Sequence, residues 1–186
     1  MRGIMTEPTD MLFIVTGGPG SGKTTLLAAL SEAGLPTSIE AGRAIIQDQV
    51  AIGGGALPWG DRSAFAELML CWEMRSYREM LGRMERPVFF DRGVPDVAAY
   101  LRLCGLPVPA HIDQAARLLR YNRRVFIAPP WPEIFRQDAE RKQNFAEAAA
   151  TYQALVATYQ DYGYELVSLP LASVAERLDA VRAVTG

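Results

Sequence analysis

The stretch that decides the fold of this chain reads Gly17-Gly18-Pro19-Gly20-Ser21-Gly22-Lys23-Thr24-Thr25. It fits the pattern G-x-x-x-x-G-K-[ST], which is typical of loops that bind nucleotide phosphates. Residues 11–15, before it, form a short apolar run that predicts a buried strand, and residues 26–30, after it, are strong helix formers. A strand, a glycine loop and a helix in this order are the context that such a loop requires. The sequence therefore predicts a binding site for a nucleoside triphosphate.

The residue types in this loop suit phosphate binding for physical reasons. Glycines let the backbone curl so that successive N–H groups point inward, and the dipole of the following helix adds positive potential. We expect Lys23 to reach the β- and γ-phosphates and the Thr24 hydroxyl to join the ligands of a Mg²⁺ ion. The alternative is an ordinary glycine-rich turn between a strand and a helix, which the spacing and the context disfavour.

Length and composition indicate one globular domain. The 186 residues are 49% hydrophobic and 22% charged, and the net charge of −2 argues against a nucleic-acid partner. Cys71, Cys104 and His111 make neither a disulfide framework nor a zinc pattern. No apolar run approaches the ~18 residues of a membrane span, and residues 1–10 lack the apolar region of a signal peptide. We expect a cytoplasmic protein without a membrane partner, with a flexible lead-in before a domain over residues 11–186. The oligomeric state stays open.

Strand-like and helix-like segments alternate along the chain. The predicted strands are residues 11–16, 36–39, 87–91, 125–128 and 164–169. The first predicted helix follows the glycine loop and ends at residue 33. The other predicted helices are residues 40–50, 61–84, 96–104, 109–121, 133–160 and 172–184. This alternation predicts an α/β fold of three layers, with a five-stranded parallel sheet between helices. Because ligands in such sheets bind beyond the C-terminal strand ends, the glycine loop, Glu40, Asp91 and residues 129–143 should share one edge.

Asp91 ends a continuous apolar run, where nucleotide-binding proteins often place a carboxylate that holds Mg²⁺. An aspartate that only caps a turn is the alternative. Arg92 follows directly, at a position where hydrolytic motors usually carry a glutamate that polarises water. An arginine is always protonated and cannot do this, although it can bind a phosphate or an acceptor oxygen. This pair therefore favours phosphotransfer over hydrolysis.

Glu40 and Arg43 follow the second predicted strand three residues apart, so on a helix they face one way. Glu40 could accept the proton of an acceptor hydroxyl or bind metal, and Arg43 could hold an anionic acceptor. A glutamate favoured at a helix start, with an intrahelical ion pair, is the alternative.

A charged segment follows the fourth predicted strand and its two prolines. In a phosphotransferase, a mobile lid over residues 129–143 would bring positive charge onto the transferring phosphate. Its candidate residues are Arg136, Arg141 and Lys142, and a solvated helix face is the alternative.

With these motifs placed, the chain resembles a family of small bacterial AAA-type proteins that are predicted to be ATPases but are organised like kinases. The resemblance spans about residues 11–184 and rests on the glycine loop, Glu40-Ala41-Gly42-Arg43, Asp91-Arg92-Gly93, residues 96–100 and the 136–141 segment. More distantly, the chain is similar to nucleoside and nucleoside-monophosphate kinases, cytidylate-kinase-like proteins included. That similarity implies the strand order 2-3-1-4-5, lid arginines, a glutamate base that matches Glu40, and an acidic-arginine pair that matches Asp91-Arg92.

These observations favour an ATP- and Mg²⁺-dependent phosphotransferase that acts on a small nucleoside- or nucleotide-like acceptor. Its expected catalytic residues are Lys23, Glu40, Asp91, Arg92, Arg136 and Arg141. Its expected nucleotide-binding residues are Gly17, Gly18, Pro19, Gly20, Ser21, Gly22, Lys23, Thr24 and Thr25, and its expected Mg²⁺ ligands are Thr24 and Asp91. The alternative is an ATP-binding switch or slow ATPase that regulates a protein partner. The acceptor and the choice between ATP and GTP stay open.

Overall fold

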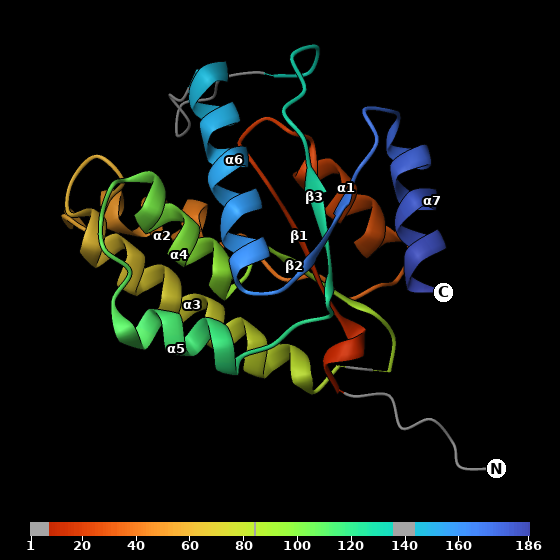
Figure 1. Ribbon diagram of the computed structural model, residues 1–186, viewed down its shortest axis with the longest axis horizontal. Helices are drawn as coiled ribbons and strands as arrows, with labels where there is room; N and C mark the ends of the chain where they lie inside the picture. Colours follow the sequence, from red (N-terminus) through yellow and green to blue (C-terminus); the bar gives the residue numbers. More distant parts are fainter. Residues whose placement is uncertain (1–7, 84, 136–143) are drawn as a thin grey trace.

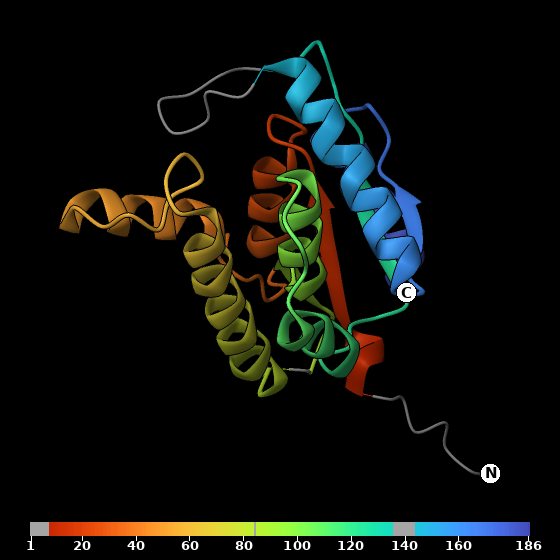
Figure 2. The same cartoon turned by 60° about the vertical axis from the view of Figure 1, so that its left-hand side comes forward.

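A parallel sheet lies between two groups of helices in the computed structural model, which describes residues 8–83, 85–135 and 144–186 (Figures 1 and 2). The strands are β1 (Leu12–Gly17), β2 (Val88–Asp91), β3 (Arg124–Ala128) and β4 (Glu165–Ser168). They lie in the order β2-β1-β3-β4, and every neighbouring pair is parallel. The α/β fold with a parallel sheet is therefore confirmed.

Seven α-helices are found in the described ranges, with a short 3₁₀ helix, η1 (Pro8–Met11), before β1. They are α1 (Lys23–Glu32), α2 (Ala41–Ile52), α3 (Arg62–Leu81), α4 (Val94–Leu103), α5 (Ala110–Leu118), α6 (Phe145–Asp161) and α7 (Val174–Thr185). None of these helices combines the length and the apolar character that are needed to cross a bilayer.

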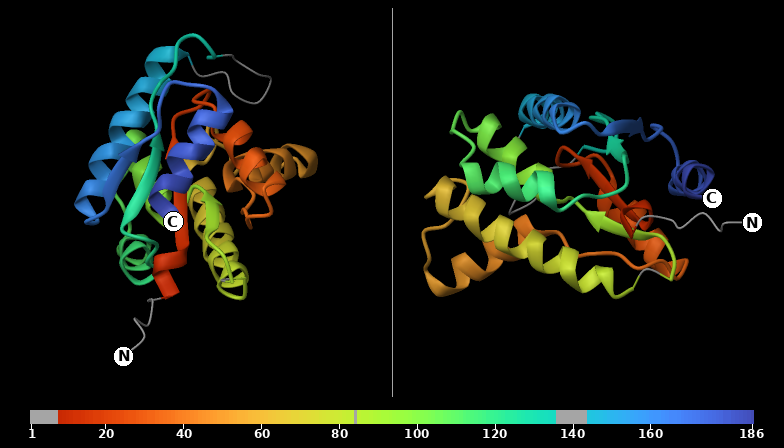
Figure 3. Two further views of the ribbon diagram at one scale, coloured as in Figure 1. Left: turned by 90° about the vertical axis from the view of Figure 1, so that its right-hand side faces the viewer. Right: turned by 60° about the horizontal axis from the view of Figure 1, so that its bottom comes forward.

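Each face of the sheet carries its own apolar cluster, because successive residues of a strand point to opposite sides. Leu12 and Ile14 of β1 face a cluster that α3, α4, α5 and α6 cover. Phe13 and Val15 face a cluster that α1 and α7 cover. Figure 3 shows α6 and α7 on opposite sides of the strands. Burial on both faces explains why β1 and β2 are continuous apolar runs.

The predicted strand over residues 36–39 is reduced to one parallel bridge between Thr37 and Phe89 of β2. Phe89 N–H donates to the carbonyl oxygen of Pro36 at 2.8 Å, and Ser38 N–H donates to that of Phe89 at 2.9 Å. Pro36 has no N–H with which to extend the ladder, and the side chain of Ile39 is 71% exposed and gains little from packing, so the pairing stops at one bridge. The segment still lies beside β2. The expected order 2-3-1-4-5 is thus present as four strands and a bridge instead of five strands.

Most helix boundaries differ from the predicted ones by up to three residues, and the start of α6 differs by twelve. Asp61, the first residue of the predicted helix over 61–84, caps α3, and its side chain accepts from the N–H of Ala64 at 2.9 Å. The helix predicted from Asp96 begins earlier, as α4 with Gly93 as its N-cap residue, so Asp96 lies in the first turn. The helix predicted from residue 133 begins as α6 only after Asn144, which caps it.

The carboxyl ends of the strands lie at one edge of the sheet, as expected for a parallel sheet. The glycine loop follows β1, Arg92 follows β2, and the turn that begins at Trp131 follows β3. This edge is therefore where the candidate site is found.

Candidate functional site

The glycine loop joins β1 to α1 in a conformation that depends on glycine. Gly17, the last residue of β1, has φ 145°, and a Cβ there would come within 2.5 Å of a carbonyl oxygen of β3. Residues 18–22 form the loop, which the Ser21 hydroxyl closes by donating to the carbonyl oxygen of Gly18 at 2.7 Å. The loop therefore curls back over the end of its own strand.

Lys23 is the first residue of α1 and is 4% exposed. Its ammonium donates to the carbonyl oxygens of Gly17 at 3.1 Å and Gly18 at 3.3 Å, so it lies inside the curl. No side chain caps the start of α1, where Gly22 is the N-cap residue, and Thr24 and Thr25 are exposed in the first turn. An uncapped helix start beside a buried ammonium is a favourable place for a phosphate.

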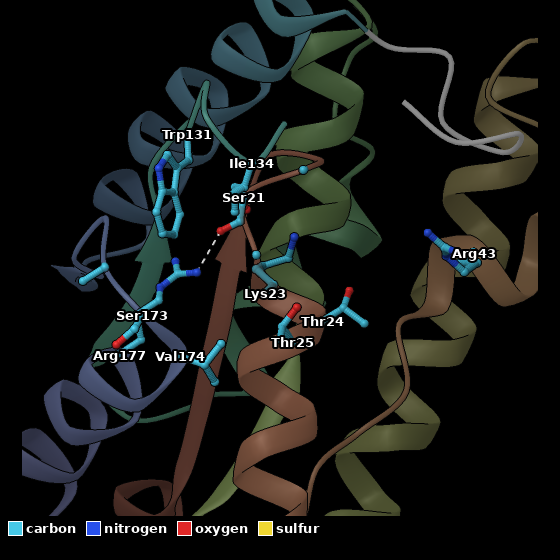
Figure 4. A pocket seen from close by; sticks show the side chains of 13 residues that line it. Ser21, Lys23, Thr24, Thr25, Arg43, Trp131, Ile134, Ser173, Val174 and Arg177 are labelled. Carbon is cyan, nitrogen blue, oxygen red and sulfur yellow. Dashed lines mark hydrogen bonds between the residues drawn. The ribbon is translucent and has the colours of Figure 1, made fainter. Parts of the chain in front are cut away.

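Two clefts adjoin the loop. The first, of about 520 Å³, is lined by residues 20–25, Arg43, Trp131, Ile134, residues 172–174 and Arg177. The second, of about 480 Å³, lies between α1 and α2 and is lined by Thr24, Leu27, Ala28, Ser31, residues 37–40, Arg43, Ala44, Gln47 and Asp91. Thr24 and Arg43 line both clefts, so the two clefts are adjacent beside the start of α1. Figure 4 shows Trp131 and Arg177 on one side of the first cleft, Arg43 on the other, and Lys23 between them.

Asp91 ends β2 and is 6% exposed. Its backbone N–H donates to the hydroxyl of Ser38 at 3.0 Å, whereas its carboxylate oxygen Oδ1 is buried and has no hydrogen-bond partner among the described residues. Burial raises the pKa of the Asp91 carboxyl, and the charges of Lys23 and Arg92 offset part of that rise.

Asp91 and Thr24 line the same cleft, and a buried carboxylate oxygen without a partner among the described residues is a suitable ligand for a Mg²⁺ ion. Mg²⁺ usually takes one or two protein oxygens and keeps water and phosphate oxygens as its other ligands. A group of three or more metal-ligating His, Cys, Asp or Glu side chains is absent from the described ranges. Asp91 and Thr24 could therefore hold the ion as a pair, with the phosphates of a nucleotide.

Arg92 follows β2 with a left-handed backbone, φ 72°, which costs a non-glycine residue about 1–3 kcal/mol and often marks functional sites. Its side chain lies between two carboxylates, with Nε 3.4 Å from Oε1 of Glu40 and Nη1 3.2 Å from Oδ1 of Asp96. Burial alone would lower the pKa of the Arg92 guanidinium, but Glu40, Asp96 and Asp91 together raise it above its ordinary value. The structure thus brings Glu40, Asp91 and Arg92 together, as the sequence predicted from segments about fifty residues apart.

Asp96 holds Arg92 in place, a role that the sequence analysis missed. One carboxylate oxygen accepts from the Thr16 hydroxyl at 2.6 Å and from Arg92. The other accepts from the N–H of Gly93 at 3.0 Å and from the hydroxyl of Tyr159. The spacing of four residues from Arg92, which suits an ion pair, was the available signal, whereas the contact with Tyr159 has no counterpart in the local sequence.

Glu73 is a second carboxyl group that the sequence analysis missed. It lies on the inward face of α3 and is 3% exposed. Burial raises the pKa of the Glu73 carboxyl well above the usual 4.5, and the negative charges of Asp96 and Asp91 raise it further. Its spacing of four residues from Met69 and from Tyr77, both on the apolar side of the helix, could have revealed it.

Replacing Glu73 with glutamine is expected to raise the Tm by about 3 °C or more at pH 8 and to leave it nearly unchanged at pH 4.5. The folded protein binds the proton of Glu73 more tightly than the unfolded chain does. Stability is therefore lost as the pH rises from about 4.5 toward the higher pKa of the folded state, and glutamine removes that loss. The check is thermal unfolding of both proteins between pH 4.5 and 8. Glu79→Gln, on an exposed position of the same helix, is the control, and an equal effect of Glu73→Gln at both pH values would contradict the assignment.

Trp131, which lines the first cleft, lies inside the predicted lid segment 129–143 but was not one of its candidate residues, and Arg177 was not predicted to belong to a site. Trp131 could have been predicted, because it follows Pro129-Pro130 at the end of β3. Arg177 could not, because it lies on α7 and only the tertiary fold places it beside the first cleft. The predicted residues Arg136, Arg141 and Lys142 lie outside the described residues. The predicted lid therefore stays a prediction.

Comparison with known proteins gives a match to the family described as AAA domain over residues 12–177. No curated protein matches. Among solved structures, NadR protein in complex with NR has a TM-score of 0.68 at 19% identity, covering 94% of this chain and 50% of that one. Deoxyadenosine kinase from M. mycoides, with dCMP and dCDP bound, has a TM-score of 0.68 at 12% identity, covering 92% of this chain and 97% of that one.

NadR protein in complex with NAD and AMP-PNP is similar to the same degree, with a TM-score of 0.67 and 19% identity. The chain spans about half the length of the NadR chains that it matches. At these identities the likeness establishes a shared fold.

Proposed function

This chain belongs to the AAA domain family of P-loop proteins, and we propose that it is a phosphotransferase that moves the γ-phosphoryl group of ATP to a small nucleoside- or nucleotide-like acceptor. The observation that carries the proposal is the adjacency of two clefts at Thr24 and Arg43. One contains the glycine loop and the other contains Glu40 and Asp91. Direct transfer requires a donor site beside an acceptor site, which this arrangement offers.

In the first cleft, the loop N–H groups and the start of α1 would hold the phosphates of ATP. Lys23 is already beside this position and would exchange its carbonyl partners for β- and γ-phosphate oxygens. Thr24 and Asp91 would hold a Mg²⁺ ion, which when bound supplies positive charge that neutralises the phosphate oxygens. The buried oxygen of Asp91 would thereby gain the partner that it lacks among the described residues.

In the second cleft, Glu40 would act on the acceptor. Its carboxylate would accept the proton of an acceptor hydroxyl as the hydroxyl oxygen forms a bond to the γ-phosphorus and the bond to the ADP oxygen breaks. Arg92 fixes the orientation of Glu40 and keeps its own positive charge beside the transferring group. Arg43, at the junction of the clefts, would contact an anionic group of the acceptor or the donor.

The fold of deoxyadenosine kinase from M. mycoides supports a nucleoside-like acceptor by analogy, because the two chains match along nearly their whole lengths. The size of the second cleft, about 480 Å³, is also in the range of small-molecule sites.

The test is transfer of radiolabelled γ-phosphate from MgATP across a panel of nucleosides and nucleoside monophosphates. We expect one acceptor to be phosphorylated. We expect Lys23→Ala to lower the rate by about 1,000-fold or more, because it removes the ammonium that would neutralise negative charge on the phosphoryl group during transfer. Arg75→Ala, at an 80% exposed position on α3, should leave the rate unchanged. Slow release of free phosphate with every acceptor inert would overturn the proposal in favour of a slow ATPase.

A further inference from the structure

Arg177 reaches from α7 to the back of the glycine loop, although it is 156 residues away from that loop in sequence. It is 2% exposed, and its Nη1 donates to the carbonyl oxygen of Ser21 at 3.0 Å (Figure 4). Its other two guanidinium nitrogens, Nε and Nη2, are buried and find no hydrogen-bond partner in residues 8–83, 85–135 and 144–186. The contact with Ser21 therefore uses only one of the nitrogens that this side chain brings to the loop.

The charge of Arg177 has no carboxylate partner within the part of the chain that the structure describes. Its guanidinium instead lies over the ring of Trp131, with Cζ 5.6 Å from the ring centroid. Burial lowers the pKa of Arg177, but a guanidinium stays protonated under ordinary conditions. A buried cation without a counter-charge is costly. The fold thus keeps an uncompensated positive charge directly behind the site where a triphosphate would lie.

This charge acts on a peptide group of the loop. The carbonyl of Ser21 and the N–H of Gly22 belong to the same peptide unit, so a cation that binds the oxygen makes the N–H a stronger donor. Gly22 caps α1 and lines the first cleft. A Cβ at Gly22 would lie 2.5 Å from Nη1 of Arg177, so a glycine at this position also makes room for the guanidinium.

We propose that Arg177 is a positioning residue for the nucleotide, which polarises the Ser21–Gly22 peptide toward the bound phosphates and receives from them its missing counter-charge. This inference rests on the proposed binding of ATP in the first cleft and adds a residue to it.

Arg177→Met tests the inference because it removes the charge and keeps an unbranched side chain beneath Trp131. The measurements are the dissociation constants for MgATP and for inorganic triphosphate, and the Tm without ligand. We expect both ligands to bind about ten-fold more weakly, as for the loss of one charge-assisted hydrogen bond. Arg177→Lys should recover part of that loss. The Tm without ligand should stay the same or rise, since the costly buried charge is gone.

Three results would overturn the inference. A lower Tm without ligand, or failure of both variants to fold, would make Arg177 a structural support of the loop. Weaker binding of MgATP alone, with inorganic triphosphate unaffected, would assign Arg177 to the base. Wild-type binding of both ligands by Arg177→Met would leave it without a role in the site. Arg182→Met, at an exposed position of the same helix, is the control. If the wild type itself binds no ATP, the proposed function falls and the inference falls with it.

Discussion

Replacing Glu40 with glutamine is expected to slow phosphoryl transfer by about 100-fold or more and to leave the dissociation constant for MgATP within about two-fold of the wild-type value. Glu40 lines the second cleft and not the first, so the change does not touch the glycine loop. Glutamine has nearly the same shape and can still accept from Nε of Arg92, which lies 3.4 Å from Oε1 of Glu40. It cannot take the proton of an acceptor hydroxyl. The variant therefore separates proton acceptance from the geometry of the site.

The two quantities are measured separately, by calorimetric titration with MgATP and by transfer to the acceptor that the panel identifies. Asp48→Asn makes the same acid-to-amide change at an exposed position of α2 and should alter neither quantity. A transfer rate that survives in Glu40→Gln would reduce Glu40 to a residue that begins a helix. Weakened binding of MgATP would instead indicate that Glu40 belongs to the donor site.

The parts of this site that could be predicted from the sequence are those whose functional residues are close together in the chain. The loop over residues 17–25 carries its strand, its glycines, its lysine and its helix in one continuous segment, so its geometry follows from local rules. Asp91-Arg92 was singled out for a similar reason, since it ends a short apolar run that favours a buried strand, which the structure has as β2. The α/β alternation then placed Glu40 at the same edge, where the structure has it.

The parts that could not be predicted depend on contacts between distant segments. The hydroxyl of Tyr159 reaches Asp96 across 63 residues, and Arg177 reaches Ser21 across 156. No local sequence pattern predicts such pairs, because a tyrosine or an arginine on a helix is more often an ordinary core or surface residue. The same reasoning explains the strand that was lost over residues 36–39. Its β-branched residues favour a strand, but Pro36 lacks an N–H and Ile39 is exposed, so pairing with β2 is limited to one bridge.

Replacing Asp96 with alanine is expected to lower the free energy of unfolding by about 3–5 kcal/mol, since it breaks a buried ion pair by removing one partner. Asp96 is 7% exposed and accepts from four donors. Without its carboxylate, the Thr16 hydroxyl and the Tyr159 hydroxyl are left buried and unpaired, and Arg92 keeps only Glu40 as a close partner. For a chain of this length the Tm should fall by roughly 10 °C. Urea denaturation followed by circular dichroism gives the free energy directly.

The chain offers a matched control in Asp161, whose carboxylate also pairs with an arginine, Arg102, at 2.7 Å. That carboxylate is 63% exposed, so Asp161→Ala should cost no more than about 1 kcal/mol. The contrast between the two variants isolates burial, because both remove an aspartate that is paired with an arginine. A cost for Asp96→Ala within about 1 kcal/mol of the control would contradict the buried network.

The same variant links stability to the site. Arg92 holds a strained left-handed backbone, and among its described contacts the carboxylates of Glu40 and Asp96 fix its side chain. Asp96→Asn keeps the shape and an accepting oxygen but loses the charge, so we expect an unfolding free energy between those of the wild type and Asp96→Ala. If Arg92 is aimed by Asp96, the asparagine variant should lower the rate of transfer while MgATP binding stays intact. Loss of both phosphoryl transfer and MgATP binding would show instead that Asp96 maintains the structure of the strand ends and the glycine loop. The hydrogen bond from the Thr16 hydroxyl of β1 to Asp96 offers a physical route for that effect.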